Sequence, residues 1–115
     1  MLPLDRQCQL AGLPVPTGEY LFARYLTTAV LVTIGLTKKR MWALDWAWVG
    51  EQLALEVEGG YAMIRGRHTS AKGFLADQQK YNALACLGWR LLRVTPRDVA
   101  SGAALTWIQL ALAKG

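Results

Sequence analysis

Two short runs of alternating residues, separated by a sequence typical of a turn, constrain this chain more than any other feature. The first run spans residues 41–48 and the second spans residues 53–58. Alternation with a period of two is typical of a strand that buries one face. Gly50 and Glu51, which lie between the runs, suit a two-residue type II′ turn because that turn requires glycine first. We therefore predict a β-hairpin whose register is fixed by this turn.

The predicted register brings acidic side chains together. Asp45 faces Glu56 on a side of the hairpin that is otherwise lined by alanine, and Glu58 lies diagonally from Asp45. Directly opposed residues have Cβ atoms about 5 Å apart, so the two carboxylates repel unless a cation lies between them. Mg²⁺ prefers carboxylate oxygens together with water and substrate phosphate. The hairpin is therefore a candidate Mg²⁺ site, in which Glu58 ligates the metal, holds a water or positions a basic group. A solvated polar face is the alternative.

The large apolar residues of the first run are expected to share the opposite, buried face. They are Trp42, Leu44, Trp46 and Trp48. The tryptophans are therefore interpreted as structural residues.

The rest of the chain is predicted to complete a small α/β domain that spans residues 1–115. We expect a helix over residues 4–12, a buried strand over 29–34, a helix over 71–87, a strand over 89–94 and a final helical stretch to about residue 113. Gly88 is placed for a left-handed C-terminal cap, and Thr95 and Asp98 are placed for a capped helix start. This order predicts a central mixed β-sheet flanked by helices.

Charge favours an anionic partner. The chain has 13 Lys+Arg against 8 Asp+Glu, a net charge of +5. The anionic partner of such a chain is most often nucleic acid, although many basic proteins bind none. Basic residues gather before and after the hairpin, and they are candidate DNA-phosphate contacts or, alternatively, solvated loops. They are Lys38, Lys39 and Arg40 on one side, and Arg65, Arg67, His68 and Lys72 on the other. A hydrophobic content of 53% excludes a disordered chain.

Several other classes are disfavoured. Cys8 and Cys86 lack metal-ligand or disulfide-framework spacing, so two reduced thiols are expected. The N-terminus lacks a signal-peptide pattern, and the longest uncharged run, residues 25–37, is too short to span a membrane. There is no phosphate-binding glycine loop. We expect a cytoplasmic protein with no membrane association and no organic cofactor.

Five segments, in this order, resemble the PD-(D/E)XK nuclease superfamily. They are residues 44–48 (Leu-Asp-Trp-Ala-Trp), 55–60 (Leu-Glu-Val-Glu-Gly-Gly), 66–68 (Gly-Arg-His), 77–82 (Asp-Gln-Gln-Lys-Tyr-Asn) and 88–95 (Gly-Trp-Arg-Leu-Leu-Arg-Val-Thr). The chain is more closely similar to short phage-encoded proteins related to archaeal-type Holliday junction resolvases and to very-short-patch-repair-like endonucleases. The resemblance covers about residues 41–113. The acidic motif is short, and the ordered combination is much more specific.

The resemblance implies a restriction-endonuclease-like fold and a metal site. Asp45 and Glu56 would bind Mg²⁺, with Mn²⁺ as a substitute, and the backbone carbonyl of Val57 would be a further ligand. Glu19 is the candidate for the upstream glutamate that completes the site in the resolvases.

The chain departs from the superfamily pattern at the motif lysine. Glu58 stands at that position, so the identity of the general base is open. Lys80, His68 or a second metal would have to take over its role. The segment 25–40 also reads as an added strand pair, which is a candidate dimer edge.

The function implied by the resemblance is metal-assisted hydrolysis of DNA phosphodiesters in the cytoplasm of a host cell. A junction resolvase makes two symmetric nicks in a four-way DNA junction, so a two-fold homodimer is expected. A monomeric mismatch-directed or nonspecific nicking enzyme is the alternative within the nuclease class. Outside that class, the alternatives are an inactive DNA-binding module and an interaction protein with an acidic hairpin face.

Overall fold

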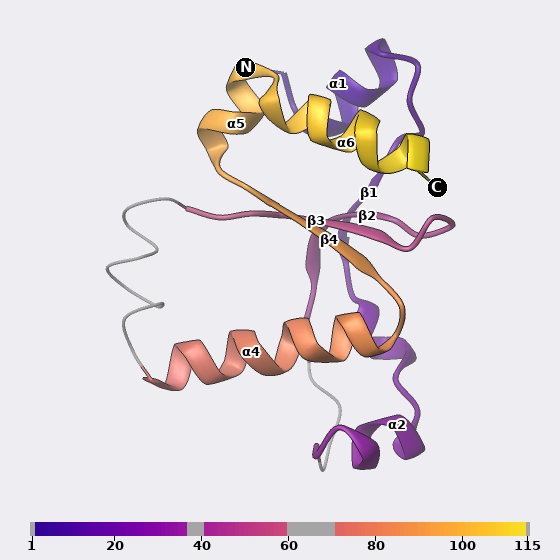
Figure 1. The fold of residues 1–115 in the computed structure, drawn as a ribbon, viewed down its shortest axis with the longest axis vertical. Coiled ribbons are helices and arrows are strands. Elements are labelled where there is room, and N and C mark those ends of the chain that lie inside the picture. Colours follow the sequence, from indigo (N-terminus) through magenta and orange to yellow (C-terminus); the bar gives the residue numbers. More distant parts are fainter. Residues whose placement is uncertain (1, 37–40, 60–70, 115) are drawn as a thin grey trace.

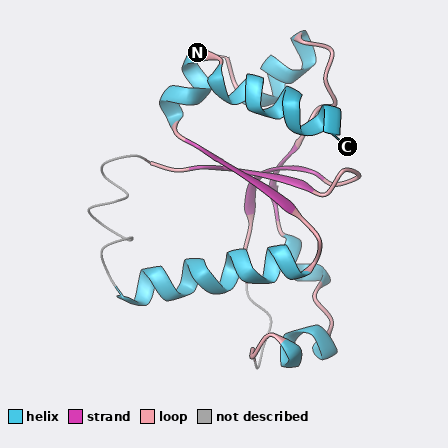
Figure 2. Cartoon of the chain, in the orientation of Figure 1, coloured by secondary structure: helices cyan, strands magenta, loops and turns pink. Residues whose placement is uncertain are grey.

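The computed structural model of the protein describes residues 2–36, 41–59 and 71–114, with side chains described from residue 75 onward in the last segment. Within these residues there are four strands, five α-helices and one short 3₁₀ helix (Figure 1 and Figure 2). In chain order they are α1 (Leu4–Leu10), β1 (Thr17–Tyr20), the 3₁₀ helix η1 (Phe22–Tyr25), α2 (Thr28–Thr33), β2 (Leu44–Trp48), β3 (Leu53–Val57), α4 (Ala71–Cys86), β4 (Arg90–Val94), α5 (Pro96–Ser101) and α6 (Ala103–Lys114).

The four strands form one mixed sheet in the order β1-β2-β3-β4. The first three strands pair antiparallel, and β4 pairs parallel to β3. Parallel neighbours need a long crossover connection, and α4 lies in that connection. Figure 1 shows α1, α5 and α6 on one side of the sheet and α4 on the other. The protein is therefore a small α/β domain with a mixed sheet, as predicted.

Both faces of the sheet are packed. The first cluster joins the sheet to α1, α5 and α6, and it contains Leu4, Cys8, Trp48, Leu53, Leu55, Val94, Val99, Ala104 and Ile108. The second lies on the α4 side and contains Phe22, Leu44, Ala47, Ala54 and Leu84. A third, smaller cluster holds η1 and α2 together through Ala23, Leu26, Leu31 and Leu36. Since β3 contributes to both main clusters, its one acidic residue, Glu56, is fixed in a well-packed strand.

The predicted boundaries after α4 are confirmed. Gly88 adopts a left-handed conformation with φ of 88° at the end of the helix. Thr95 and Asp98 form a reciprocal capping box at the start of α5. Gly102, with φ of 89°, separates α5 from α6, which runs to Lys114. Local signals of this kind satisfy backbone groups at helix ends and so determine where helices begin and end.

The predicted strand over residues 29–34 is wrong, and so is the strand pair over the described part of 25–40. Residues Thr28–Thr33 form α2, and the side chain of Thr27 caps it by accepting a hydrogen bond from the backbone N–H of Val30. Preference for β-structure reflects a fit to a pleated, half-buried surface rather than a backbone rule. Here a short helix buries Leu31 in the third cluster, and that tertiary contact overrides the β-branched sequence.

The hairpin turn also differs in type from the prediction. β2 ends at Trp48 and β3 begins at Leu53, so the loop has four residues, closed by two backbone hydrogen bonds of 3.2 Å. Gln52 rather than Gly50 adopts the left-handed φ, at 49°. The predicted register is nevertheless confirmed, because Trp48 pairs with Leu53. The loop is one residue longer on each side than predicted, and this symmetric lengthening leaves the pairing of the two strands unchanged.

The four large apolar residues of the first run do not share one face. Trp46 and Trp48 pack toward α1, α5 and α6, whereas Leu44 and Trp42 belong to the cluster on the α4 side. The strand begins only at Leu44, so strict alternation does not govern Trp42. The indole N–H of Trp48 donates a hydrogen bond of 2.8 Å to the carbonyl of Pro14, which satisfies its polar atom within the core.

Two further sequence predictions can be compared with the described residues. Cys8 is buried and Cys86 is exposed, and both are free thiols. Among the described helices, none is long and apolar enough to cross a membrane.

The capping box gives a test of local stability. Replacing Thr95 with alanine removes the acceptor for the Asp98 N–H at the start of α5, so we expect the free energy of unfolding to fall by about 1 kcal/mol. Urea denaturation followed by circular dichroism would measure the change. Thr28→Ala, at an exposed position of α2, is the matched control. An equal loss in both variants would contradict the capping role.

Candidate active site

The site lies where the ladder between β2 and β3 gives way to side-chain hydrogen bonds. The backbone N–H of Asp45 donates to Oε2 of Glu56 at 3.2 Å. The backbone N–H of Val57 donates to Oδ2 of Asp45 at 2.7 Å. Each carboxylate is therefore held by the opposite strand, and the two acids are neighbours as the sequence predicts.

Helix α4 supplies a cation to this pair. Nζ of Lys80 forms an ion pair with Oε1 of Glu56, and the side chains of Lys80 and Glu56 are only 13% and 7% exposed. Hydrogen bonds between ionised groups are stronger than those between neutral groups. The ion pair thus joins α4 to the sheet at Glu56. It places Lys80, which the sequence made a candidate catalytic residue, beside the acidic pair.

Burial shapes the electrostatics of these groups. Burial raises the pKa of Glu56 above its ordinary value, and the negative charge of Asp45 acts in the same direction, while Lys80 opposes both. Burial also raises the pKa of the neighbouring Tyr81 to about 12, with Glu56 adding to the effect. Tyr81 is therefore neutral at physiological pH. At Glu56 the positive charge of Lys80 offsets only part of the rise in pKa that burial causes.

Glu58 is engaged in a different contact. Its backbone N–H donates to the carbonyl of Val94 at 2.7 Å, and its carboxylate accepts a hydrogen bond of 2.7 Å from Nε of Arg93. The guanidinium of Arg93 in turn lies 4.9 Å from the ring centroid of Tyr81. Three roles were predicted for Glu58: ligating a metal, holding a water or positioning a basic group. Its contact with Arg93 corresponds to the last of these.

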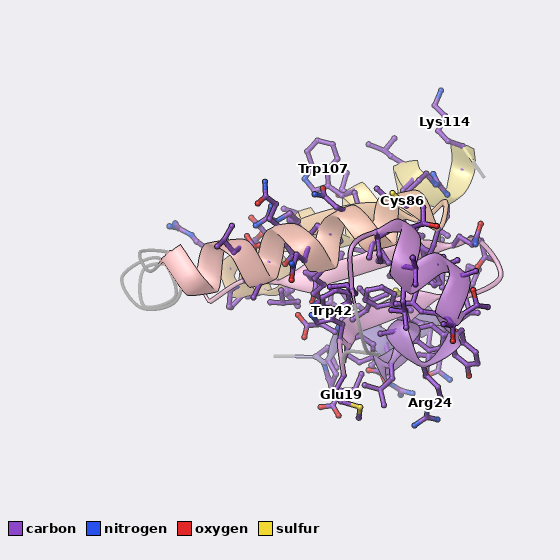
Figure 3. The ribbon with its side chains drawn as sticks, turned by 90° about the horizontal axis from the view of Figure 1, so that it is seen from below. Glu19, Arg24, Trp42, Cys86, Trp107 and Lys114 are labelled. Atoms are coloured by element: carbon purple, nitrogen blue, oxygen red, sulfur yellow. The ribbon has the colours of Figure 1, made fainter. Side chains whose placement is uncertain are left out.

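Glu19 lies across from Asp45 in the register of β1 and β2. It is exposed, and its φ of 49° is unusual for a residue other than glycine. Figure 3 shows its carboxylate pointing outward. Glu19, Asp45 and Val57 line one open hollow of about 580 Å³, together with Gly18 and Trp46. The three predicted ligands other than Glu56 thus border the same space.

The described residues hold a pair of acids rather than a ready-made cluster. Among them, no group of three His, Cys, Asp or Glu side chains is arranged to hold a metal ion. Glu56 and Asp45 are bonded to one another's strands, while Glu58 is paired with Arg93. A cation bound here would therefore draw on backbone carbonyls and water as well as on carboxylates.

Sequence reasoning missed Arg93 and Tyr81. Arg93 pairs with Glu56 in the parallel register of β3 and β4, but that register depends on the crossover and cannot be counted along the chain. Tyr81 lies within the predicted helix over residues 71–87, and its contacts with Lys80 and Arg93 were not predicted. Arg93 lies within residues 88–95, one of the five segments that resemble the superfamily, and this was the signal available in the sequence.

Most of the predicted phosphate contacts lie outside the described residues. These are Lys38, Lys39, Arg40, Arg65, Arg67 and His68. Lys72 lies in α4, but its side chain is also outside the description.

Comparisons of the chain with family models, with curated proteins and with solved structures find no match.

The Lys80 contact gives a test by pH titration. We expect Lys80→Met to raise the pKa of Glu56 further, because burial and Asp45 would then act without an opposing cation. A carboxyl ¹³C NMR titration would measure the shift. Lys114→Met, which removes an exposed charge at the end of α6, is the control and should leave the Glu56 titration unchanged.

The same substitution has a defined effect on stability. Because the pKa of Glu56 is raised in the folded protein, the folded chain keeps a proton that the unfolded chain has already lost between the two pKa values. Stability from this group is therefore greatest below the unfolded pKa and falls as the pH rises through the folded pKa. Lys80→Met should widen that window and lower stability at neutral pH, and an unchanged pH profile would contradict the assignment.

Proposed function

We propose that this protein is a metal-dependent DNA endonuclease of the PD-(D/E)XK type, with a restriction-endonuclease-like fold. The observation that carries the proposal is the placement of Asp45, Glu56 and Lys80 in one contact group. The two acids come from a hairpin whose second strand is followed by a helix and a parallel strand, and the helix returns a lysine to the acids. This arrangement accords with the ordered motifs of the sequence.

The donor set fits a hard divalent cation. Asp45 is exposed and faces the hollow, Val57 brings a backbone carbonyl to its border, and Glu19 borders it from β1. Oxygen donors of this kind, completed by water, suit Mg²⁺ or Mn²⁺. Bound there, the cation would polarise a phosphate and lower the pKa of a bound water. Asp45 and Glu56 would hold the cation, and each would be oriented by the backbone N–H of the opposite strand.

Lys80 takes the part of the missing motif lysine in this proposal. Glu58 occupies the usual lysine position and is paired with Arg93, so that position supplies no cation to the acids. Lys80 reaches Glu56 from α4 instead. It would keep Glu56 ionised and bring positive charge beside a substrate phosphate. His68, which lies outside the described residues, remains a second candidate for the proton transfers.

The preferred substrate is branched DNA. The net charge of +5 favours a nucleic-acid backbone. The motifs resemble those of short phage proteins related to junction resolvases and to very-short-patch-repair-like endonucleases. Two symmetric nicks need two active sites related by a two-fold axis, so a homodimer is proposed. A mismatch-directed or nonspecific nicking enzyme would use the same acids as a monomer. A host-cell cytoplasm and a phage origin follow from the resemblance alone.

Cleavage assays with acid variants test the proposed function. We expect Asp45→Asn and Glu56→Gln each to abolish Mg²⁺-dependent cleavage of a labelled four-way junction, since each removes a metal ligand. DNA affinity should stay equal or rise, because a negative charge beside phosphate is also removed. Glu51→Gln, in the exposed turn at the other end of the hairpin, is the matched control. A linear duplex and an EDTA reaction complete the comparison.

The outcomes separate the candidate functions. Paired symmetric nicks in the junction alone, dependent on Mg²⁺ and on Asp45, would support a resolvase. Equal cutting of junction and duplex would support a nonspecific nuclease. DNA binding without cleavage by the wild-type protein would instead favour an inactive DNA-binding module. Cleavage retained in Asp45→Asn would overturn the site assignment.

Phosphate contacts give an independent prediction. Arg67 lies outside the described residues, and the sequence places it in the basic segment that follows the acids. We expect Arg67→Ala to weaken DNA binding and to reduce the slope of log affinity against log salt by about 1. Fluorescence anisotropy across a range of NaCl concentrations would measure both. A weaker affinity with an unchanged salt slope would exclude a phosphate contact.

A further inference from the structure

A second hollow has a lining quite unlike that of the acidic site. Its volume is about 250 Å³, and none of the described residues that line it is charged. They are Tyr20, Phe22, Tyr25, Val49, Gln52, Leu87 and Trp89. Four of these seven side chains are aromatic, and Gln52 adds one amide. The lining therefore suits a flat, uncharged group with hydrogen bonds at its edge.

The aromatic rings form a small stacked array. Tyr20 lies with its ring centroid 6.0 Å from that of Tyr25, and the two planes differ by only 18°. Tyr20 also lies 5.9 Å from Trp89 at an angle of 35°. Tyr25, at the outer end of this array, is 65% exposed. An exposed ring that is supported from behind presents its face to a ligand at little cost in side-chain ordering.

We propose that this aromatic groove binds the nucleobase of an unpaired nucleotide, with Tyr25 as the stacking surface. Proteins that bind unpaired strands combine aromatic platforms for bases with positive charge for phosphates. The described residues of the groove wall are uncharged, which suits the base, while the net charge of +5 suits the backbone. Arg24, next to Tyr25 in η1, projects outward in Figure 3. The amide of Gln52 is the polar group available to the edge of a base.

The position of the groove relates it to the acidic site. Leu87 borders the groove and continues the hydrogen bonding of α4, seven residues beyond Lys80. Seven residues along a helix correspond to about 10 Å, or about three nucleotide steps in a stacked strand. Consecutive residues of β1 line the two hollows, since Glu19 borders the acidic one and Tyr20 the aromatic one. This inference rests on the proposed function and assigns the branch-point base of the substrate to a defined site.

Binding in EDTA tests the groove without requiring cleavage. The probes are a fluorescein-labelled single-stranded oligothymidylate and an abasic oligomer of the same length, compared by anisotropy. We expect the wild-type protein to bind the base-bearing strand more tightly. Tyr25→Ala should weaken that binding by at least about fivefold and leave the abasic affinity unchanged, whereas Tyr25→Phe should keep the preference.

A control variant and a second measurement guard against misfolding. Trp107→Ala removes an exposed aromatic ring of α6, on the other side of the sheet, and should leave the preference for bases intact. Circular dichroism would check the fold of each variant. If Tyr25→Ala does not fold, quenching of 2-aminopurine placed in the single-stranded oligonucleotide decides the question with the wild-type protein. Stacking would quench the fluorescence, and its absence would overturn the proposal.

The outcomes distinguish this proposal from the proposed function. Cleavage of the junction with equal binding of base-bearing and abasic strands would overturn the groove alone. A Tyr25-dependent base preference without any cleavage would support the groove and overturn the nuclease. If no DNA is bound at all, both proposals fail. Loss of a dimer in Tyr25→Ala by sedimentation equilibrium would assign the groove to a second copy of the chain and overturn the nucleobase site.

Discussion

The ion pair between Lys80 and Glu56 connects helix α4 to strand β3 of the sheet. One partner lies on the helix that crosses over between parallel strands, and the other lies in the middle of the sheet. Removing one partner of a fully buried ion pair costs about 3–5 kcal/mol, because the remaining charge stays desolvated. The slight exposure of this pair lowers that cost without abolishing it. The contact therefore sets the position of α4 against β3 and at the same time places a cation beside the candidate active site.

The hairpin provides the second constraint, because its backbone and its acids satisfy one another. The ladder of β2 and β3 is regular up to Trp46 and Leu55, and beyond it the N–H groups of Asp45 and Val57 donate to carboxylates. Each acid is thus oriented by the strand that carries the other. Such reciprocal bonding lets two negative charges lie close together, and it leaves the neighbouring hollow open to a ligand. The proposed function would use this preorganisation, because fixed side chains stabilise developing charge without first having to reorient.

Much of the fold was predictable where local rules decide it. The register of the hairpin follows from alternation and is confirmed. The end of α4 at Gly88 and the start of α5 at the Thr95 capping box are also confirmed. The segment 29–34 was not predictable from β-propensity, because a tertiary cluster selects a helix there. In the site, the close placement of Asp45 and Glu56 was predicted from the register. The pairing of Glu58 with Arg93 was not, since it depends on how a parallel strand returns to the sheet.

Strand β1 contains a strained backbone conformation at the edge of the site, at Glu19. A left-handed φ costs a residue other than glycine or asparagine roughly 1–2 kcal/mol, and Glu19 adopts one across from Asp45. Glycine at that position would relieve the strain. A Cβ at the neighbouring Gly18 would lie 3.2 Å from the ring of Trp46, which is a tight contact. Strain retained at one residue between two hollows calls for a reason beyond folding. The ligand role proposed for the Glu19 carboxylate in the acidic hollow, with Tyr20 bordering the aromatic groove, would account for a glutamate at that position.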